Sequence, residues 1–264
     1  MSKVDSRVYH LNAFTEACLT QQNKAFCSFE YEYILSLINK HEIKSVLDIG
    51  TGEGSFISGL AAQSHNVQYH AIDAGSDLIN IANAKNQLPN ILFENCLFDQ
   101  DFYSKQYDLI TARFSVEHMN DIEVFLAEAR KRLKVGGIIL ITEYYSDNMQ
   151  SENKHWKLFR EKEMEFYAHL GSHASSSLTI PKLLHNHHFK NIQSSFRHIA
   201  PSTIGHDDFY DLIDSYINIY GALTPTVWTE ELQAEMLEYT QLARNEKSGT
   251  TEDIILISQT IGFA

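Results

Sequence analysis

Three glycines alternate with other residues directly after a short apolar run that contains an acid. The stretch reads Val46-Leu47-Asp48-Ile49-Gly50-Thr51-Gly52-Glu53-Gly54. Because glycine has no Cβ, such a backbone can adopt positive φ angles and lie directly against a bound molecule. The spacing differs from the G-x-G-x-x-G loop of dinucleotide-binding proteins. The stretch therefore predicts a buried strand, a tight turn that contacts a ligand, and the start of a helix.

Further apolar runs alternate with helical patterns along the chain. Helical spacing follows the glycines, and Ser76 can cap a second helix with Asp77 in its first turn. The expected strands are Lys44–Ile49, Val67–Asp73, Ile91–Phe93, Tyr107–Ala112 and Ile138–Thr142, and a helix over Asp121–Lys134 closes at Gly136-Gly137. Nearly continuous apolar strands that alternate with helices predict an α/β fold, with a parallel sheet covered on both faces.

The alternation breaks after the fifth strand. Two polar and aromatic segments, residues 144–177 and 200–249, interrupt it, and a helix, Leu178–Phe189, and a strand, Asn191–Ile199, lie between them. Asp253–Thr260 is the expected last strand, and residues 1–27 read as a loose helical arm, followed by a helix before the first strand. We interpret residues 1–264 as one domain whose two insertions form a helical cap.

Four features in order over residues 44–142 resemble the class I S-adenosylmethionine-dependent methyltransferases. They are the glycine loop, Asp73 at the end of the second strand, the strand Tyr107–Ala112 followed by Arg113-Phe114-Ser115-Val116-Glu117-His118-Met119, and Leu133-Lys134-Val135-Gly136-Gly137. The resemblance implies a Rossmann-like, doubly wound, mostly parallel sheet of seven strands. It also implies S-adenosylmethionine as the cofactor, bound by the segment 44–142.

The resemblance assigns cofactor contacts to residues of this sequence. The loop would hold the methionine part, Asp73 would accept hydrogen bonds from both ribose hydroxyls, and Ala74 and Leu78 would flank the adenine. In many members of this family an acidic side chain holds the adenine amino group, but it has no clear counterpart in this sequence. Asn95 or the backbone near Leu97 would make that contact instead. The implied cofactor-binding residues are Asp48, Gly50, Thr51, Gly52, Gly54, Asp73, Ala74, Leu78, Asn95, Cys96, Leu97, Arg113 and Phe114.

The family places acceptors at the carboxyl ends of strands four and five. This points to His118 and Tyr145 as catalytic candidates, with Glu143 and Tyr144 nearby. Imidazole titrates near neutrality, so His118 can act as a base, and a base is needed only for an acceptor that is protonated at neutral pH. A structural role for His118 and a surface position for Arg113 are the alternatives.

The expected acceptor is a small, partly apolar molecule, methylated on oxygen or nitrogen. The formal net charge of −13 repels phosphate backbones and anionic lipid, so neither nucleic acid nor a membrane is an expected partner. The sequence leaves open whether the protein forms a homodimer. Methylation of a tRNA or a protein, and a non-catalytic protein that only binds the cofactor, are the competing hypotheses. In the expected closed state Tyr9 and Phe14 of the arm complete the lid over the acceptor.

The remaining features of the sequence indicate a cytoplasmic protein without a metal. Cys18, Cys27 and Cys96 fit no metal spacing and read as free thiols in a reducing compartment. No apolar run approaches the length of a membrane span, and Met1–His10 has no signal-peptide pattern. His185, His187 and His188 lack a partner ligand at zinc spacing and read as a solvated helix end.

Overall fold

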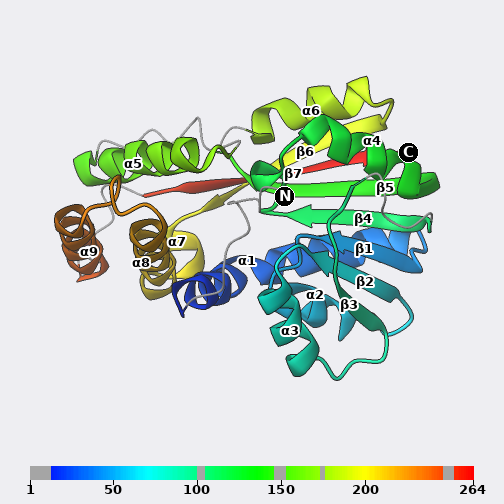
Figure 1. Cartoon of the computed structure of the whole chain (residues 1–264), viewed down its shortest axis with the longest axis horizontal. Coiled ribbons are helices and arrows are strands. Elements are labelled where there is room, and N and C mark those ends of the chain that lie inside the picture. The colour runs from blue at the N-terminus through cyan, green and yellow to red at the C-terminus, as the bar shows by residue number, and fades with distance from the viewer. Residues whose placement is uncertain (1–12, 100–104, 146–152, 173–175, 246–252) are drawn as a thin grey trace, which may run out of the picture.

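The computed structural model describes residues 13–99, 105–145, 153–172, 176–245 and 253–264. Seven strands of this described part form one sheet in the order β3-β2-β1-β4-β5-β7-β6 (Figure 1). They are β1 (Ser45–Ile49), β2 (Gln68–Asp73), β3 (Ile91–Asn95), β4 (Tyr107–Arg113), β5 (Leu133–Tyr144), β6 (Lys190–Ile199) and β7 (Ile255–Phe263). Strands β1 to β5 pair in parallel, and β7 runs antiparallel to both β5 and β6. The mostly parallel, seven-stranded sheet predicted from the sequence is confirmed.

Helices cover both faces of the sheet. On one face α1 (Ala13–Lys40), α2 (Ser55–Ala61) and α3 (Ser76–Lys85) pack on side chains such as Val46 and Leu109. On the other face α4 (Ile122–Arg132) and α6 (Ser176–Asn186) pack on side chains such as Leu47 and Ile110. Because both faces of β1 and β4 are covered, these strands are apolar almost throughout, as the sequence pattern requires.

A separate hydrophobic cluster lies beyond the carboxyl end of β5. It is built by α5 (Lys154–Leu170), α7 (Pro201–Ile204), α8 (His206–Leu223), α9 (Glu230–Asn245) and the first half of α1 (Figure 1). Trp156 and Trp228 are fully buried in this cluster. They therefore pack the interior of this helical cluster, whose helices α5, α7, α8 and α9 we call the cap, and neither is among the residues that line the cavity described below.

Several boundaries differ from those expected from the sequence. A single helix of 28 residues, α1, replaces a loose arm and a separate helix over residues 13–40. Residues 1–12, with Tyr9, lie outside the described residues, and nothing of the Phe14 side chain is described. Helix α4 ends at Arg132 because Leu133 already pairs with Tyr107 of β4, and Gly136, with φ of 77°, lies inside β5 instead of closing the helix.

Candidate active site

The glycine loop connects β1 to α2 in a backbone conformation that glycine favours. Gly50 and Gly54 have φ angles of 76° and 80°. A Cβ on Gly50 would lie 2.5 Å from the Cβ of Ser115, and one on Gly54 would lie 2.6 Å from the Phe93 ring. The loop is therefore packed against the ends of β3 and β4, and its shape depends on the missing side chains.

Asp73, at the end of β2, ties this loop to the start of α3. Its Oδ2 accepts a hydrogen bond from the Gly52 N–H at 2.8 Å, and its Oδ1 accepts one from the Gly75 N–H at 2.7 Å. Burial raises the pKa of Asp73 above its ordinary value, while both backbone hydrogen bonds oppose that rise. Each carboxylate oxygen still has acceptor capacity for a ligand hydroxyl.

A small pocket of about 70 Å³ lies beside the loop, and Asp48 and Arg113 face it. Asp48 is buried and accepts a hydrogen bond from the Thr111 hydroxyl at 2.7 Å, and burial raises its pKa. Arg113 Nε donates to Glu30 of α1 at 2.9 Å. The Arg113 Nη2 is buried and has no hydrogen-bond partner among the described residues. The pocket therefore offers both a carboxyl group and a guanidinium group.

A large cavity of about 1380 Å³ extends from the glycine loop to the cap. The structure brings ten of the predicted site residues to its walls: Gly50, Gly52, Asp73, Ala74, Leu78, Asn95, Cys96, Leu97, Phe114 and His118. Asp48, Thr51 and Arg113 line the small pocket, which shares Gly50, Gly52 and Phe114 with the large cavity. Gly54 lines neither space and acts at the helix start, where it precedes Ser55.

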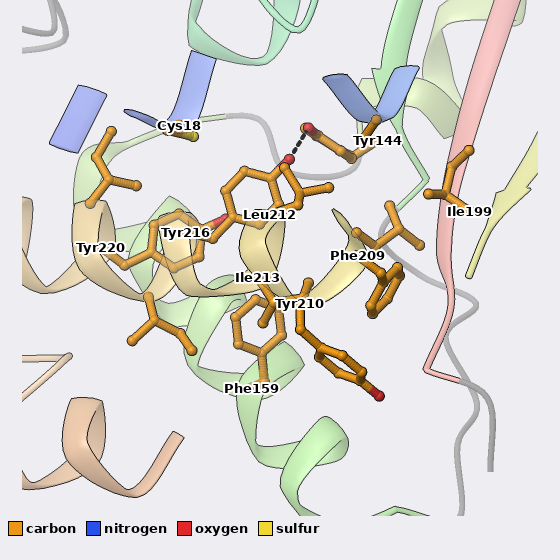
Figure 2. Close-up of a cluster of buried hydrophobic side chains, with 14 of the residues drawn as sticks. Cys18, Tyr144, Phe159, Ile199, Phe209, Tyr210, Leu212, Ile213, Tyr216 and Tyr220 are labelled. Atoms are coloured by element: carbon orange, nitrogen blue, oxygen red, sulfur yellow. Dashed lines mark hydrogen bonds between the residues drawn. The ribbon is translucent and has the colours of Figure 1, made fainter. Parts of the chain in front are cut away.

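The far side of the cavity is a continuous wall of aromatic rings, which we call the aromatic wall. It consists of Phe114, Tyr144, Tyr216, Tyr220, Phe166 and Tyr167, all of which line the cavity. Successive ring centroids lie 4.3, 6.1, 5.9, 4.2 and 5.4 Å apart. The Tyr144 and Tyr216 hydroxyls are hydrogen-bonded to each other (Figure 2), and Gln22 of α1 donates to the Tyr144 hydroxyl at 3.1 Å. Strand β5, the cap and α1 therefore meet at this wall.

Tyr145 does not lie where the sequence led us to expect it. Its ring packs edge-on against Phe196 of β6 at 5.1 Å, and its N–H donates to the Leu256 carbonyl. It is not among the residues that line the cavity, whereas Tyr144 is. Successive side chains of an extended chain point to opposite sides, so only one of two adjacent tyrosines can face the cavity. The expected position of Tyr145 in the cavity is thus corrected: its neighbour Tyr144 lines the cavity instead.

Two buried glutamates lie behind and beside the cavity. Glu143 Oε1 accepts hydrogen bonds from the backbone N–H groups of Ser115 at 3.1 Å and Val116 at 2.7 Å, at the start of the short helix η1 (Val116–His118). Burial raises the pKa of Glu143 to about 8. Glu117 is 2% exposed and lines the cavity. Burial raises the pKa of Glu117 well above its ordinary value, and the nearby Glu143 raises it further.

His118 lines the cavity, yet both of its ring nitrogens lie near partners. Nε2 lies 3.4 Å from Glu117 Oε1, and Nδ1 lies 3.3 Å from the Ser172 hydroxyl. The other oxygen of Glu117, Oε2, is buried and has no hydrogen-bond partner among the described residues. Glu117 is therefore a candidate proton acceptor at this end of the cavity, alongside His118.

Sequence reasoning missed most of the acceptor side of the cavity. In the sequence Glu117 stands out only as the neighbour of His118, and Tyr216 and Tyr220 lie in the insertion 200–249, which the sequence assigns only to the cap. Their four-residue spacing on α8 places them on one side of that helix, which was the available signal. Nothing in the sequence indicates that Cys18, Leu19 and Gln22 line the cavity, because the path of α1 across the cavity depends on tertiary packing.

The histidines of α6 and the turn after it lie away from this cavity. His187 Nε2 pairs with Glu123 of α4 at 2.5 Å. Within the described ranges, no group of three or more histidine, cysteine, aspartate or glutamate side chains is arranged to hold a metal ion. Nor does any helix in those ranges combine the length and apolar character needed to cross a membrane.

Comparison with known families identifies the fold and the loop. A family model described as a methyltransferase domain matches residues 20–194, well over half of the chain. The chain belongs to this family. This confirms the resemblance drawn from the glycine loop, Asp73 and the segment after β4, and the matched range includes α5, α6 and the part of α1 from residue 20 onward.

Curated relatives of this methyltransferase domain match a shorter stretch. The ubiquinone biosynthesis O-methyltransferase of Rickettsia canadensis (strain McKiel) is 31% identical over 117 residues, which are 42% of this chain and 49% of that protein. The malonyl-[acyl-carrier protein] O-methyltransferase of Bacillus cytotoxicus is 23% identical over 134 residues, 49% of this chain and 47% of that protein. The chain spans about half the length of the curated relatives it matches.

Solved structures share the fold over most of this chain. The plantazolicin methyltransferase BpumL in complex with S-adenosylhomocysteine (SAH) superimposes with a TM-score of 0.59 at 18% identity, covering 99% of this chain and 91% of that one. Phosphoethanolamine N-methyltransferase 2 of Haemonchus contortus in complex with S-adenosyl-L-methionine superimposes with a TM-score of 0.55 at 15% identity. The match covers 96% of this chain and 60% of that one. The [4+2]-cyclase SpnF superimposes with a TM-score of 0.53 at 16% identity, covering 83% of this chain and 74% of that one. At these identities the likeness establishes the fold.

Proposed function

We propose that this protein transfers a methyl group from S-adenosylmethionine to an oxygen or nitrogen of a small-molecule acceptor. The observation that carries the proposal is the single cavity of about 1380 Å³, with Asp73 and the glycine loop at one end and the aromatic wall at the other. A cavity of this size has room for a cofactor and an acceptor together.

The residues at the loop end fit the chemical groups of the cofactor. Asp73 is fixed by two backbone N–H groups and retains acceptor capacity for two ribose hydroxyls. The small pocket pairs Asp48 with the free Nη2 of Arg113, which suits the ammonium and carboxylate of an amino acid. Ala74, Leu78 and the segment Asn95–Leu97 form the adjoining wall, where the adenine would lie. When bound, S-adenosylmethionine supplies a methyl group on a positively charged sulfur.

The protein itself has to align the acceptor and exclude water. The aromatic wall and the first half of α1 enclose the acceptor end, and the hydrogen bond from Gln22 to Tyr144 joins them. We infer that the two insertions and α1 together act as the acceptor pocket and its lid. Enclosure of this kind aligns the reacting groups and keeps water from the sulfonium.

The acidic charge supports a small acceptor over a nucleic acid. A net charge of −13 gives the protein a field that repels phosphate backbones. We propose that the protein acts in the cytoplasm, because all three cysteines are free thiols, which suits a reducing compartment. The homodimer stays a prediction, which light scattering of the purified protein checks.

Methyl transfer is tested with radiolabelled S-adenosylmethionine and a pool of small metabolites. We expect label to move into a small, extractable product, and SAH to bind the protein. Label in tRNA or protein would favour the competing macromolecular acceptors. Tight SAH binding without transfer to any acceptor, while the cap remains folded, would favour a protein that only binds the cofactor.

A further inference from the structure

Glu117 lines the acceptor end of the cavity, and one oxygen of its buried carboxyl group lacks a partner among the described residues. Its Oε1 lies 3.4 Å from both the Tyr167 hydroxyl and His118 Nε2, while its Oε2 has no hydrogen-bond partner among the described residues. A carboxylate without a full set of partners in so buried a place is costly. A ligand that brings a positively charged hydrogen-bond donor would remove that cost.

The groups around Glu117 do not already neutralise it. Glu143, from β5, adds a second buried acid, and its Oε2 also lacks a partner among the described residues. Arg160 of α5 is the nearby cation, but its guanidinium pairs with Glu163 and does not line the cavity. Burial lowers the pKa of Arg160, and His118 carries a charge only when protonated. Among the described residues near Glu117, the arginine is therefore paired with another acid, and the cavity-lining histidines His118 and His169 carry charge only when protonated.

The aromatic wall adds a second, independent feature that favours a cation. Six rings from β5, α5, α8 and the turn after β4 line the same cavity as Glu117, and His118 stacks on Tyr167 at 6.4 Å. The faces of aromatic rings attract ammonium groups, most strongly where water is excluded. The same rings accommodate an apolar body attached to the charged group.

From these two features we propose that the acceptor is a primary or secondary amine that enters as an ammonium ion, and that the Glu117 carboxylate removes its proton. This inference rests on the proposed methyl transfer and names the class of its substrate. One proton moves from the ammonium nitrogen to the Glu117 carboxylate, leaving a neutral amine with a free electron pair and a neutral carboxyl group. The nitrogen then forms its bond to the methyl carbon as the carbon–sulfur bond breaks and that electron pair stays on sulfur. The methylated product leaves as a cation, and Glu117 releases its proton to water.

Binding of matched ligands tests the charge preference. Calorimetry at saturating SAH compares 2-phenylethylamine with 2-phenylethanol and phenylacetate, and butylamine with butanol and butyrate. Because a hydrogen bond to a charged group is among the strong ones, we expect each amine to bind about tenfold or more tightly than its alcohol and acid. Equal binding, a preference for the alcohol or the acid, or no amine binding would overturn the proposal.

Two variants separate a direct role of Glu117 from a structural one. In Glu117→Gln the amine preference should fall about tenfold, and the rise of amine affinity with pH that accompanies ionisation of Glu117 should disappear. In Glu143→Gln the preference should remain and that rise should shift to lower pH, because a like charge has been removed. An unchanged pH profile in Glu117→Gln would contradict the proposal.

The cofactor end provides the control for folding and for the function itself. Glu117→Gln should bind SAH as the unmodified protein does, as should Glu123→Gln, a surface glutamate on α4. If the unmodified protein fails to bind SAH, the proposed function fails. If SAH binds but the amines show no preference, only the amine inference fails.

Discussion

Gln22 Nε2 donates a hydrogen bond to the Tyr144 hydroxyl at 3.1 Å, and thereby joins residues that lie 122 positions apart in the chain. Gln22 lies on α1, and Tyr144 ends β5 and is hydrogen-bonded in turn to Tyr216 of the cap (Figure 2). The N-terminal helix, the sheet and the cap are thus connected above the cavity. Opening the cavity requires this connection to break or to move as a unit.

The first prediction concerns the closure of α1. When SAH binds, amide hydrogen exchange should slow in the segment 13–26 of α1 as well as in the glycine loop, because bound ligand stabilises the closed arrangement. Tyr144→Phe removes the hydroxyl that Gln22 and Tyr216 share, so the protection of α1 should decrease. Protection confined to residues 48–78 would show that α1 is not part of a lid.

The second prediction concerns Asp73. Asp73→Ala removes a partly buried acceptor that holds Gly52 and Gly75, and SAH affinity should fall by on the order of 1.5–3 kcal/mol. Asp77→Asn, an exposed acid in the first turn of α3, is the matched control and should change affinity little. If the Asp73 variant is folded by circular dichroism and binds SAH unchanged, the assignment of the ribose contact is wrong.

The sequence predicts the residues of the cofactor half of the cavity better than those of the acceptor half. Gly50, Gly52 and Asp73 could be placed because loop geometry and strand order depend on local residue types, and these local signals agree with the observed sheet. Asn95 and Cys96 reached the cavity wall because β3 ends beside β2, as the strand order implies.

The acceptor half could not be placed in the same way. Whether Tyr144 or Tyr145 faces the cavity depends on where β5 ends, and β5 is longer than its apolar core Ile138–Thr142. Arg113 was expected at the cofactor or on the surface, but its main contact is Glu30 on α1, 83 residues earlier in the chain. Contacts of this kind depend on how helices pack, and one sequence carries little information about them.

The third prediction concerns the buried ion pair between Arg113 and Glu30. The Glu30 side chain is 1% exposed, so Glu30→Gln leaves the guanidinium without a charged partner. Breaking such a pair should lower the free energy of unfolding by roughly 3–5 kcal/mol. Urea denaturation of this variant and of Glu32→Gln, an exposed neighbour on α1, makes the comparison. Equal stability of the two variants would show that the pair contributes nothing.

The fourth prediction is a pH dependence that comes from Glu143. Its pKa is about 8 in the folded protein, against an ordinary value of 4.5, because it is buried. The folded state therefore holds a proton that the unfolded state has lost between these two values. The free energy of unfolding should fall as pH rises from 4.5 to about 8, by up to about 1.4 kcal/mol per pH unit.

Glu143→Gln should reduce this slope, because a neutral amide keeps an acceptor for the Ser115 and Val116 N–H groups without a charge. Relative to the unmodified protein, the variant should gain stability at pH 8 more than at pH 5. Thermal unfolding across that range measures the difference, with Glu123→Gln as a surface control. A parallel pH profile in the variant and the unmodified protein would mean that Glu143 is ionised in the folded state throughout.

The most direct measurement is calorimetry of SAH and of NAD with the purified protein. The alternating glycines, the Asp48–Arg113 pocket and Asp73 together should bind SAH at micromolar strength, which corresponds to a free energy of about −8 kcal/mol. We expect NAD to bind far more weakly, because the loop lacks the G-x-G-x-x-G spacing that cradles a pyrophosphate. NAD binding as tight as that of SAH, or no binding of SAH, would contradict the assignment of this cavity to methyl transfer.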